Sequence, residues 1–303
     1  MLISRPFSRR SFLAGATALV SLPTLPARAS GHDASRIVSV GGSVTETLYF
    51  LKRDSRLVGV DTTSVFPDAA TSLPKVGYMR ALSVEGVLSL DPTLLLAAEG
   101  SGPPNALQSL RATGLDTAII PDARSVPDVL RNIDMIAEIV GAVSEADTLT
   151  SEIQRRATLV EAAVRRVDNR PTVLFLMDVR EGALLTAGRN TAAEAIVTLA
   201  GGRIAFTDFE GYKPAAAEAV HVASPDIILM MQHVADQLGG VEVIAQMPLL
   251  RSLSAAQNRR IHGMGGSLLL GFGPRTTDAA ATLFQILHGP APDLQALDPL
   301  VPA

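Results

Sequence analysis

The chain has 303 residues, of which 47% are apolar and 18% charged, so it can bury a sizeable core, and its length favours two domains. It contains no cysteine, which excludes disulfides, thiolate metal sites, cysteine nucleophiles and a lipid anchor attached through cysteine. The formal net charge is −4, and removal of residues 1–29, which carry four arginines and no acid, would make it about −8. An acidic surface argues against nucleic acid as a partner.

Residues 1–29 have the pattern of an export signal. The twin arginines Arg9 and Arg10 precede a modestly apolar stretch, and Ala27-Arg28-Ala29 has the small residues of a cleavage site. The apolar stretch is short and contains prolines, which argues against a membrane anchor. We therefore predict a twin-arginine signal peptide over 1–29, no membrane insertion, and a monomeric mature protein in the periplasm.

The segment 30–143 alternates strands and helices, which predicts a mostly parallel sheet covered on both faces. Its first strand, 36–40, is followed by Gly41-Gly42 and then by Ser43 and Glu46, whose spacing is that of a capping box at a helix start. A glycine pair at such a turn can bring backbone N–H groups close to an anion. It is not a dinucleotide-binding fingerprint, because the GxGxxG spacing is absent.

An internal repeat links the two halves of the chain. In the first copy, Gly77-Tyr78 precedes Glu85 on a short helix, and a buried strand follows at 93–97. In a weaker copy, Gly211-Tyr212 precedes Glu218 and a second buried strand. Each glutamate also precedes a proline by seven residues. The repeat predicts two related lobes.

Residues 144–168 differ from the rest of the chain. One apolar stripe continues over roughly 23 positions, which is about 35 Å of helix at 1.5 Å per residue. Ser144 and Asp147 can cap its start. This length exceeds that of an ordinary crossover, so we interpret the segment as a rigid connector between a lobe at 30–143 and a lobe at 169–303.

The second lobe repeats the alternation of strands and helices. Residues 172–177 read as a buried strand with a possible partner at 183–186, and Thr191 and Glu194 have capping-box spacing ahead of another helix. The predicted fold is therefore α/β, with two Rossmann-like lobes of mostly parallel sheets joined by a single long α-helix. Loops at the carboxyl ends of the strands should face a cleft between the lobes.

Several segments carry a family resemblance that covers essentially the whole mature chain. They are VGGSVTE, LPKVGYMRALSVEGVLSLDPTLLLA, TAGRNTAAEA, FEGYKPAAAEAV and LLGFGPRT. They resemble the periplasmic haem-binding proteins of haem ABC importers, a branch of the helical-backbone, class III solute-binding proteins. The resemblance implies a non-enzymatic carrier that transports ferric haem b, with an inner-membrane permease and its ATPase as partners.

The resemblance also implies roles for four residues. Tyr78 matches the axial ligand of the haem iron, and phenolate oxygen is a hard donor that suits ferric iron. A free tyrosine titrates near pH 10, so we assign Arg80 to keeping the phenolate negative. Arg275 is expected to close the opposite face of the porphyrin or to pair with a propionate, and Lys213 is a weaker propionate candidate. From spacing alone, all four also read as ordinary loop or surface residues.

Glu85 and Glu218 are the other predicted pair. The resemblance implies that each lobe offers one glutamate to arginines of the permease, and the repeat places them at the same point of each lobe. Without it they read as surface glutamates. The histidines His221, His233, His262 and His288 have no ligand spacing and are interpreted as structural.

Two other functions stay open. One is the same fold binding a ferric siderophore or a corrinoid. The other is a periplasmic enzyme that uses the Gly41-Gly42 turn as an anion site, although no Ser/His/Asp set or carboxylate pair at a usable spacing supports it.

Overall fold

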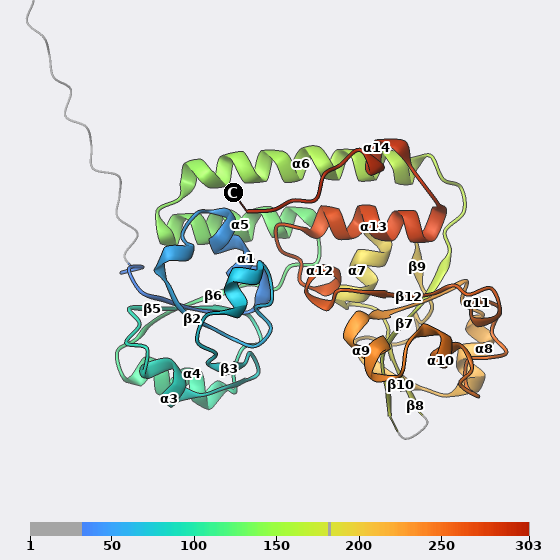
Figure 1. The fold of residues 1–303 in the computed structure, drawn as a ribbon, viewed down its shortest axis with the longest axis horizontal. Helices are drawn as coiled ribbons and strands as arrows, with labels where there is room; N and C mark the ends of the chain where they lie inside the picture. The colour runs from blue at the N-terminus through green and yellow to red at the C-terminus, as the bar shows by residue number, and fades with distance from the viewer. Residues whose placement is uncertain (1–31, 181–182, 303) are drawn as a thin grey trace, which may run out of the picture.

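The structure is a computed structural model that describes residues 32–302 apart from 181–182. The predicted signal peptide, 1–29, lies outside the described residues. Two α/β lobes are joined by one long helix, as predicted (Figure 1). In the described part of the chain, no helix combines the length and the apolarity needed to cross a membrane.

The N-terminal lobe is built on a parallel sheet. Its strands are Ile37–Val40 (β1), Leu57–Val60 (β2), Leu94–Ala98 (β5) and Asp116–Ile120 (β6), with a hairpin of Gly77–Tyr78 (β3) and Ala81–Leu82 (β4). Its helices are Gly42–Phe50 (α1), Asp54–Arg56 (η1), Asp68–Thr71 (α2), Val84–Leu88 (α3), Pro104–Ala112 (α4) and Val126–Val140 (α5). The sheet order is β2-β1-β5-β6, and all its pairings are parallel. Strands β1 and β5 are buried almost throughout because helices cover both faces of such a sheet.

The C-terminal lobe has a mixed sheet. Its strands are Thr172–Arg180 (β7), Ala183–Ala187 (β8), Arg203–Ile204 (β9), Tyr212–Ala215 (β10), Ile227–Met231 (β11) and Ile261–Met264 (β12). Its helices are Ala192–Leu199 (α7), Ala217–Ala223 (α8), Gln232–Gln237 (α9), Val241–Ala245 (α10), Ser254–Gln257 (α11), Gly266–Leu270 (α12), Thr276–His288 (α13) and Pro292–Gln295 (α14). The order is β10-β8-β7-β11-β12, with β9 beside β7. Strand β8 is antiparallel to both of its neighbours, and the other pairings are parallel.

The helix starts differ in part from the capping patterns of the sequence. Thr191 caps α7 as predicted, since its hydroxyl accepts a hydrogen bond from the N–H of Glu194 at 3.0 Å. The capping box at Ser43 and Glu46 was wrong, because Gly41 occupies the N-cap of α1 without a side-chain bond. The start of α6 has no side-chain cap from Ser144 or Asp147 either, because its N-cap is Ala142.

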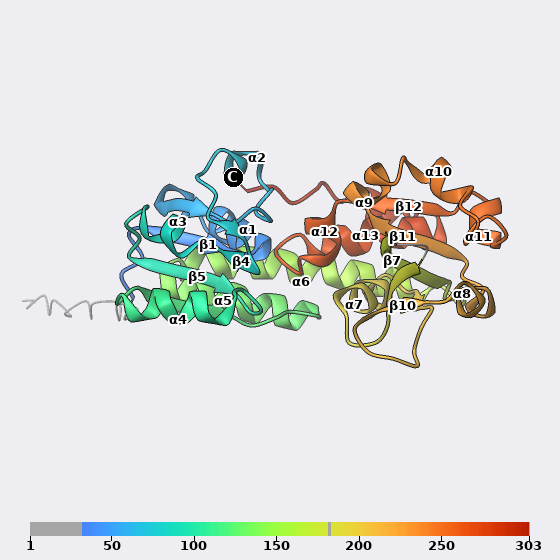
Figure 2. The same cartoon turned by 90° about the horizontal axis from the view of Figure 1, so that it is seen from below.

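The connector is α6, Val143–Arg165, for which we predicted 144–168. Figures 1 and 2 both show it running from the N-terminal lobe to the C-terminal lobe. Of the predicted stripe, Leu149, Ile153, Ala157 and Val160 are buried, whereas Val164 is half-buried and Val167 lies beyond the end of the helix. The helix packs over α5 at one end and over α13 and α14 at the other. Buried positions on α6 are Ala146, Leu149, Ile153, Arg156, Ala157, Val160 and Ala163.

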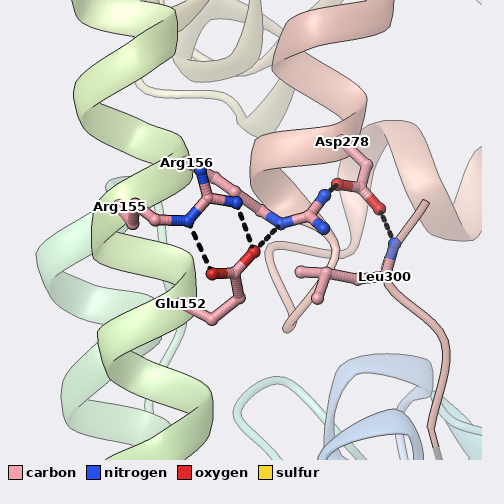
Figure 3. Close-up of polar contacts among 5 residues, drawn as sticks. All are labelled: Glu152, Arg155, Arg156, Asp278 and Leu300. Carbon is pink, nitrogen blue, oxygen red and sulfur yellow. Dashed lines mark hydrogen bonds and ion pairs between the residues drawn. The ribbon is translucent and has the colours of Figure 1, made fainter. Parts of the chain in front are cut away.

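A chain of charges ties α6 to α13 (Figure 3). Glu152 accepts hydrogen bonds from Arg155 and Arg156, which lower the pKa of its carboxyl to about 2. Arg156 also donates to Asp278 on α13 at 2.8 Å, and the N–H of Leu300 donates to the other oxygen of Asp278 at 2.7 Å. The C-terminal segment that contains Leu300 runs back from α14 toward the N-terminal lobe (Figure 1). The connector, α13 and the C-terminal segment thus meet at one carboxylate.

The largest apolar cluster does not stop at the lobe boundary. It contains Leu96 from the N-terminal sheet, Ile153 and Val160 from α6, and Phe175 and Leu229 from the C-terminal sheet. Each lobe also contains one smaller apolar cluster of its own. The lobes are therefore joined by packed side chains as well as by the backbone.

Arg156→Ala tests the link between α6 and α13. The side chain of Arg156 is only 7% exposed, so its loss leaves the carboxylate of Asp278 buried without its charged partner. We expect the free energy of unfolding to fall by about 3 kcal/mol, measured by urea titration. Arg155→Ala is the matched control, because Arg155 binds the same Glu152 but is 54% exposed. Equal losses in the two variants would contradict the assignment.

Candidate functional site

Tyr78 lies on a small hairpin whose backbone is held from two sides. Strands β3 and β4 pair Tyr78 with Ala81. The carbonyl of Gly77 accepts a hydrogen bond from Thr62, which follows β2, at 2.9 Å. On the other side, the N–H of Gly102 donates to the carbonyl of Met79 at 2.8 Å. The hairpin is thereby fixed to the loops that follow β2 and β5, at the carboxyl edge of the N-terminal sheet.

The side chain of Tyr78 is available to a ligand, because 47% of its surface is exposed. Arg80 is exposed as well. Within residues 32–302, leaving aside 181–182, no hydrogen bond joins Arg80 to Tyr78. The structure thus places both predicted residues on one hairpin without bringing the guanidinium onto the phenol.

A second tyrosine lies in the other lobe, at the start of β10. Burial raises the pKa of the Tyr212 hydroxyl, while hydrogen bonds with Ala193 and Thr191 oppose the shift. Its ring meets Phe175 edge-to-face, with 6.4 Å between centroids. A tyrosine is already a neutral phenol at neutral pH, and the raised pKa favours that form further.

Cationic side chains of the N-terminal lobe act on this tyrosine of the C-terminal lobe. Arg124 and Arg80 both lie close enough to Tyr212 to lower its pKa electrostatically. Arg124 follows β6 and is exposed. The sequence analysis missed Arg124 entirely, and it noticed Tyr212 only as part of the internal repeat. Nothing in the local sequence marks Arg124, since its position depends on how the two lobes meet.

Lys213 follows Tyr212 on β10 and is exposed. Its ammonium lies 5.5 Å from the centre of the Phe209 ring, within the range of a cation–π contact. The backbone of Lys213 pairs with Thr186 of β8. Lys213 is thus held on the C-terminal lobe beside Tyr212.

Arg275 is engaged by a carboxylate of the opposite lobe. Its Nε donates to Glu46 Oε2 at 2.9 Å, and its terminal nitrogen donates to Oε1. The hydroxyl of Ser267 donates to the same carboxylate at 2.9 Å, and the guanidinium lies 3.4 Å from the centre of the Phe66 ring. The side chain of Glu46 is 4% exposed and that of Arg275 is 14% exposed. The sequence analysis gave Glu46 a local capping role, so it missed this pair.

Glu85 and Glu218 occupy equivalent places in the two lobes. Each is exposed and lies in the first turn of a short helix, α3 and α8 respectively. An exposed aliphatic residue follows each glutamate by about one turn, Leu88 at 37% exposure and Val222 at 86%. The repeat seen in the sequence therefore presents the same pair of side-chain types on both lobes.

The described residues contain no cluster of three or more His, Cys, Asp or Glu that could hold a metal ion. His221 hydrogen-bonds Ser252, and burial lowers the pKa of His262.

A cavity of about 390 Å³ opens between α13 and the C-terminal segment, and none of the predicted site residues lines it. Its lining residues are Asp278, Ala281, Thr282, Gln285, Leu294, Gln295, Leu297 and Pro299.

Two α/β lobes on a helical connector define a class III solute-binding protein. The profile of the family described as "Periplasmic binding protein" matches residues 37–268, and the chain belongs to this family, whose members are not enzymes. It is an extracytoplasmic solute-binding protein of an ABC importer.

Solved structures with this fold include several haem-binding proteins. The chain is 35% identical to the periplasmic heme-binding protein BhuT in complex with two hemes, with a TM-score of 0.79, covering 83% of this chain and 97% of that one. It is 35% identical to RhuT from Roseiflexus sp. RS-1, with a TM-score of 0.80 and coverage of 84% and 98%. For HutB of Vibrio cholerae the identity is 32%, the TM-score 0.76, and the coverage 84% and 100%.

Curated relatives are more distant. An uncharacterized ABC transporter substrate-binding lipoprotein of Bacillus subtilis is 25% identical, covering 84% of this chain and 81% of its own. A vitamin B12-binding protein of Yersinia pestis is 28% identical, covering 72% of this chain and 75% of its own.

Gly77→Ala tests whether the hairpin geometry depends on this glycine. Gly77 has φ +103°, and a Cβ there would lie 2.7 Å from the carbonyl oxygen of Ala81. We expect a loss of about 2 kcal/mol in the free energy of unfolding, measured in urea. Gly100→Ala is the control, because Gly100 also has positive φ but has nothing within 4 Å of its Cβ position. A loss no larger than that of the control would contradict the steric argument.

Proposed function

We propose that the protein binds ferric haem between its lobes and delivers it to an ABC importer. The observation that carries the proposal is Tyr78, a 47%-exposed phenol on a backbone-anchored hairpin at the carboxyl edge of the N-terminal sheet. The solved haem-binding proteins at 31–35% identity support the same ligand.

In this proposal Tyr78 supplies the axial oxygen to the iron. Ferric iron prefers hard anionic donors, so binding of the metal favours the phenolate. Arg80 and Arg124 add positive charge on the N-terminal side, which favours both an anionic ligand oxygen and the carboxylates of the porphyrin. Lys213 offers a cation from the opposite lobe for a propionate. The two faces of the porphyrin ring are apolar, so their removal from water favours binding.

Arg275 has a different role in this proposal from Arg80 and Lys213. Its guanidinium already has a carboxylate partner in Glu46, so a propionate would compete with a buried ion pair. Of the two roles that the sequence suggested, closing the face of the porphyrin opposite Tyr78 is therefore the one we retain.

We further propose that the protein works in the periplasm as a monomer and docks on the permease through Glu85 and Glu218. Both side chains are exposed, and they stand on equivalent helices of two related lobes. Such a pair suits a partner with approximate two-fold symmetry, and arginines on that partner would complement it.

A corrinoid is the second candidate ligand, because the curated relatives include vitamin B12-binding proteins at 28% identity. A cobalamin carrier would not require an exposed phenol at position 78. Absorbance spectra of the purified protein with hemin and with cobalamin distinguish the two candidates.

Tyr78→Phe removes one oxygen atom and leaves the ring. We expect the affinity for hemin to fall roughly a hundredfold, about 2.7 kcal/mol, because the iron loses its anionic ligand. An absorbance titration measures the affinity, and the variant should also lose the phenolate-to-iron charge-transfer band.

The chain has three tyrosines, so Tyr49→Phe and Tyr212→Phe are matched controls. Both should keep the charge-transfer band seen with wild type. If Tyr78→Phe binds hemin as tightly as wild type with an unchanged spectrum, the ligand assignment is wrong.

Glu85→Gln combined with Glu218→Gln tests the docking proposal. We expect reconstituted importer to lose at least roughly tenfold in uptake, because two charged contacts with the permease are removed. The affinity for the ligand should stay unchanged, since neither residue belongs to the proposed site. Glu138→Gln, an exposed glutamate of α5, is the control. Normal uptake by the double variant would rule the docking pair out.

A further inference from the structure

The loop 271–275, between α12 and α13, belongs to the C-terminal lobe in sequence but packs against the N-terminal lobe. The side chain of Phe272 is 4% exposed and lines a small cavity together with Val44 of α1 and Ile133 of α5. Its neighbour Gly273 lies so close to α1 that a Cβ would be 3.2 Å from Ser43. The loop therefore fits into the N-terminal lobe through an aromatic side chain and a glycine contact.

The backbone of Phe272 is in a conformation that this residue type rarely adopts. Its φ is +45°, in the left-handed region where a side chain with a Cβ is strained. Strain of this kind persists where the surrounding structure holds the residue in place. Here the holding contacts come from α1 and α5 of the other lobe.

Polar side chains also join the loop 271–275 and α12 to the N-terminal lobe. Both side-chain partners that the structure gives Glu46, Arg275 and Ser267, belong to the C-terminal lobe. A carboxylate that is only 4% exposed requires such compensation. Three residues beyond Arg275, Asp278 binds Arg156 of the connector. The first turn of α13 is thus fixed to the N-terminal lobe on one side and to α6 on the other.

We infer that the loop 271–275 is an interlobe plug, and that Phe272, Arg275 and Glu46 are positioning residues that set the separation of the lobes. Glu46 of the N-terminal lobe binds the plug, and Arg275 and Phe272 are the plug side chains that make the contact. The separation of Tyr78 from Tyr212 then follows from the plug rather than from the ligand. Under the proposed haem function, the plug decides how thick a ligand the two lobes accept.

The chain has no cysteine, so two introduced cysteines report the separation directly. Ser109→Cys on α4 and Val222→Cys on α8 place spin labels at exposed positions of opposite lobes. Pulsed electron spin resonance on the ligand-free protein then gives the distribution of interlobe distances. We expect one narrow distribution for wild type, and a shift to longer or more widely spread distances in Glu46→Gln and Phe272→Ala.

Arg275→Lys is the milder variant and keeps the charge while losing the paired hydrogen bonds, so it carries the test if a stronger variant fails to fold. Ser125→Ala is the matched control, because it removes a helix cap inside the N-terminal lobe without touching the plug. Wild-type distances in every folded plug variant would overturn the inference. An equally broad distribution of interlobe distances in Ser125→Ala would overturn it too, because any destabilised variant would then give the same result. The distance measurement uses ligand-free protein, so neither outcome bears on haem binding, which the hemin titration tests separately.

Discussion

A buried carboxylate facing a guanidinium across two lobes is the contact on which the arrangement of this molecule depends. Glu46 lies on the first helix of the N-terminal lobe, and Arg275 lies just before the last long helix of the C-terminal lobe. Neither charge is well solvated, so each stabilises the other only while the lobes keep their relative position. The apolar contact of Phe272 holds the loop just before α13, and the charge chain through Arg156 holds the first turn of α13.

Apart from Arg275, which has both roles, the proposed ligand residues are distinct from the residues that join the lobes. Tyr78 and Arg80 stand on a hairpin held by backbone hydrogen bonds, so their position depends little on side-chain packing. Tyr212 and Lys213 stand on β10, which is held by pairing with β8. The two halves of the proposed site are therefore rigid within their lobes, and the distance between them is decided elsewhere.

The sequence was enough for elements whose signals are local or periodic. The buried strands, the first four residues of the stripe on α6 and the Thr191 cap follow from spacing along the chain, and the structure contains them. The repeat correctly predicted two lobes. Glu46 shows where such reasoning stops. Its position three residues after Ser43 suggested a capping box, whereas its charged partner lies 229 residues away. Arg124 was missed for the same reason, since only the meeting of two lobes brings it near Tyr212.

The main apolar cluster continues from the strands of one lobe through the connector to the strands of the other. Neither lobe therefore has a complete apolar core of its own. A fragment ending at the connector would leave α6 with half of its buried face in water. Because the two lobes share this apolar cluster, we expect the chain to unfold as one cooperative unit rather than lobe by lobe.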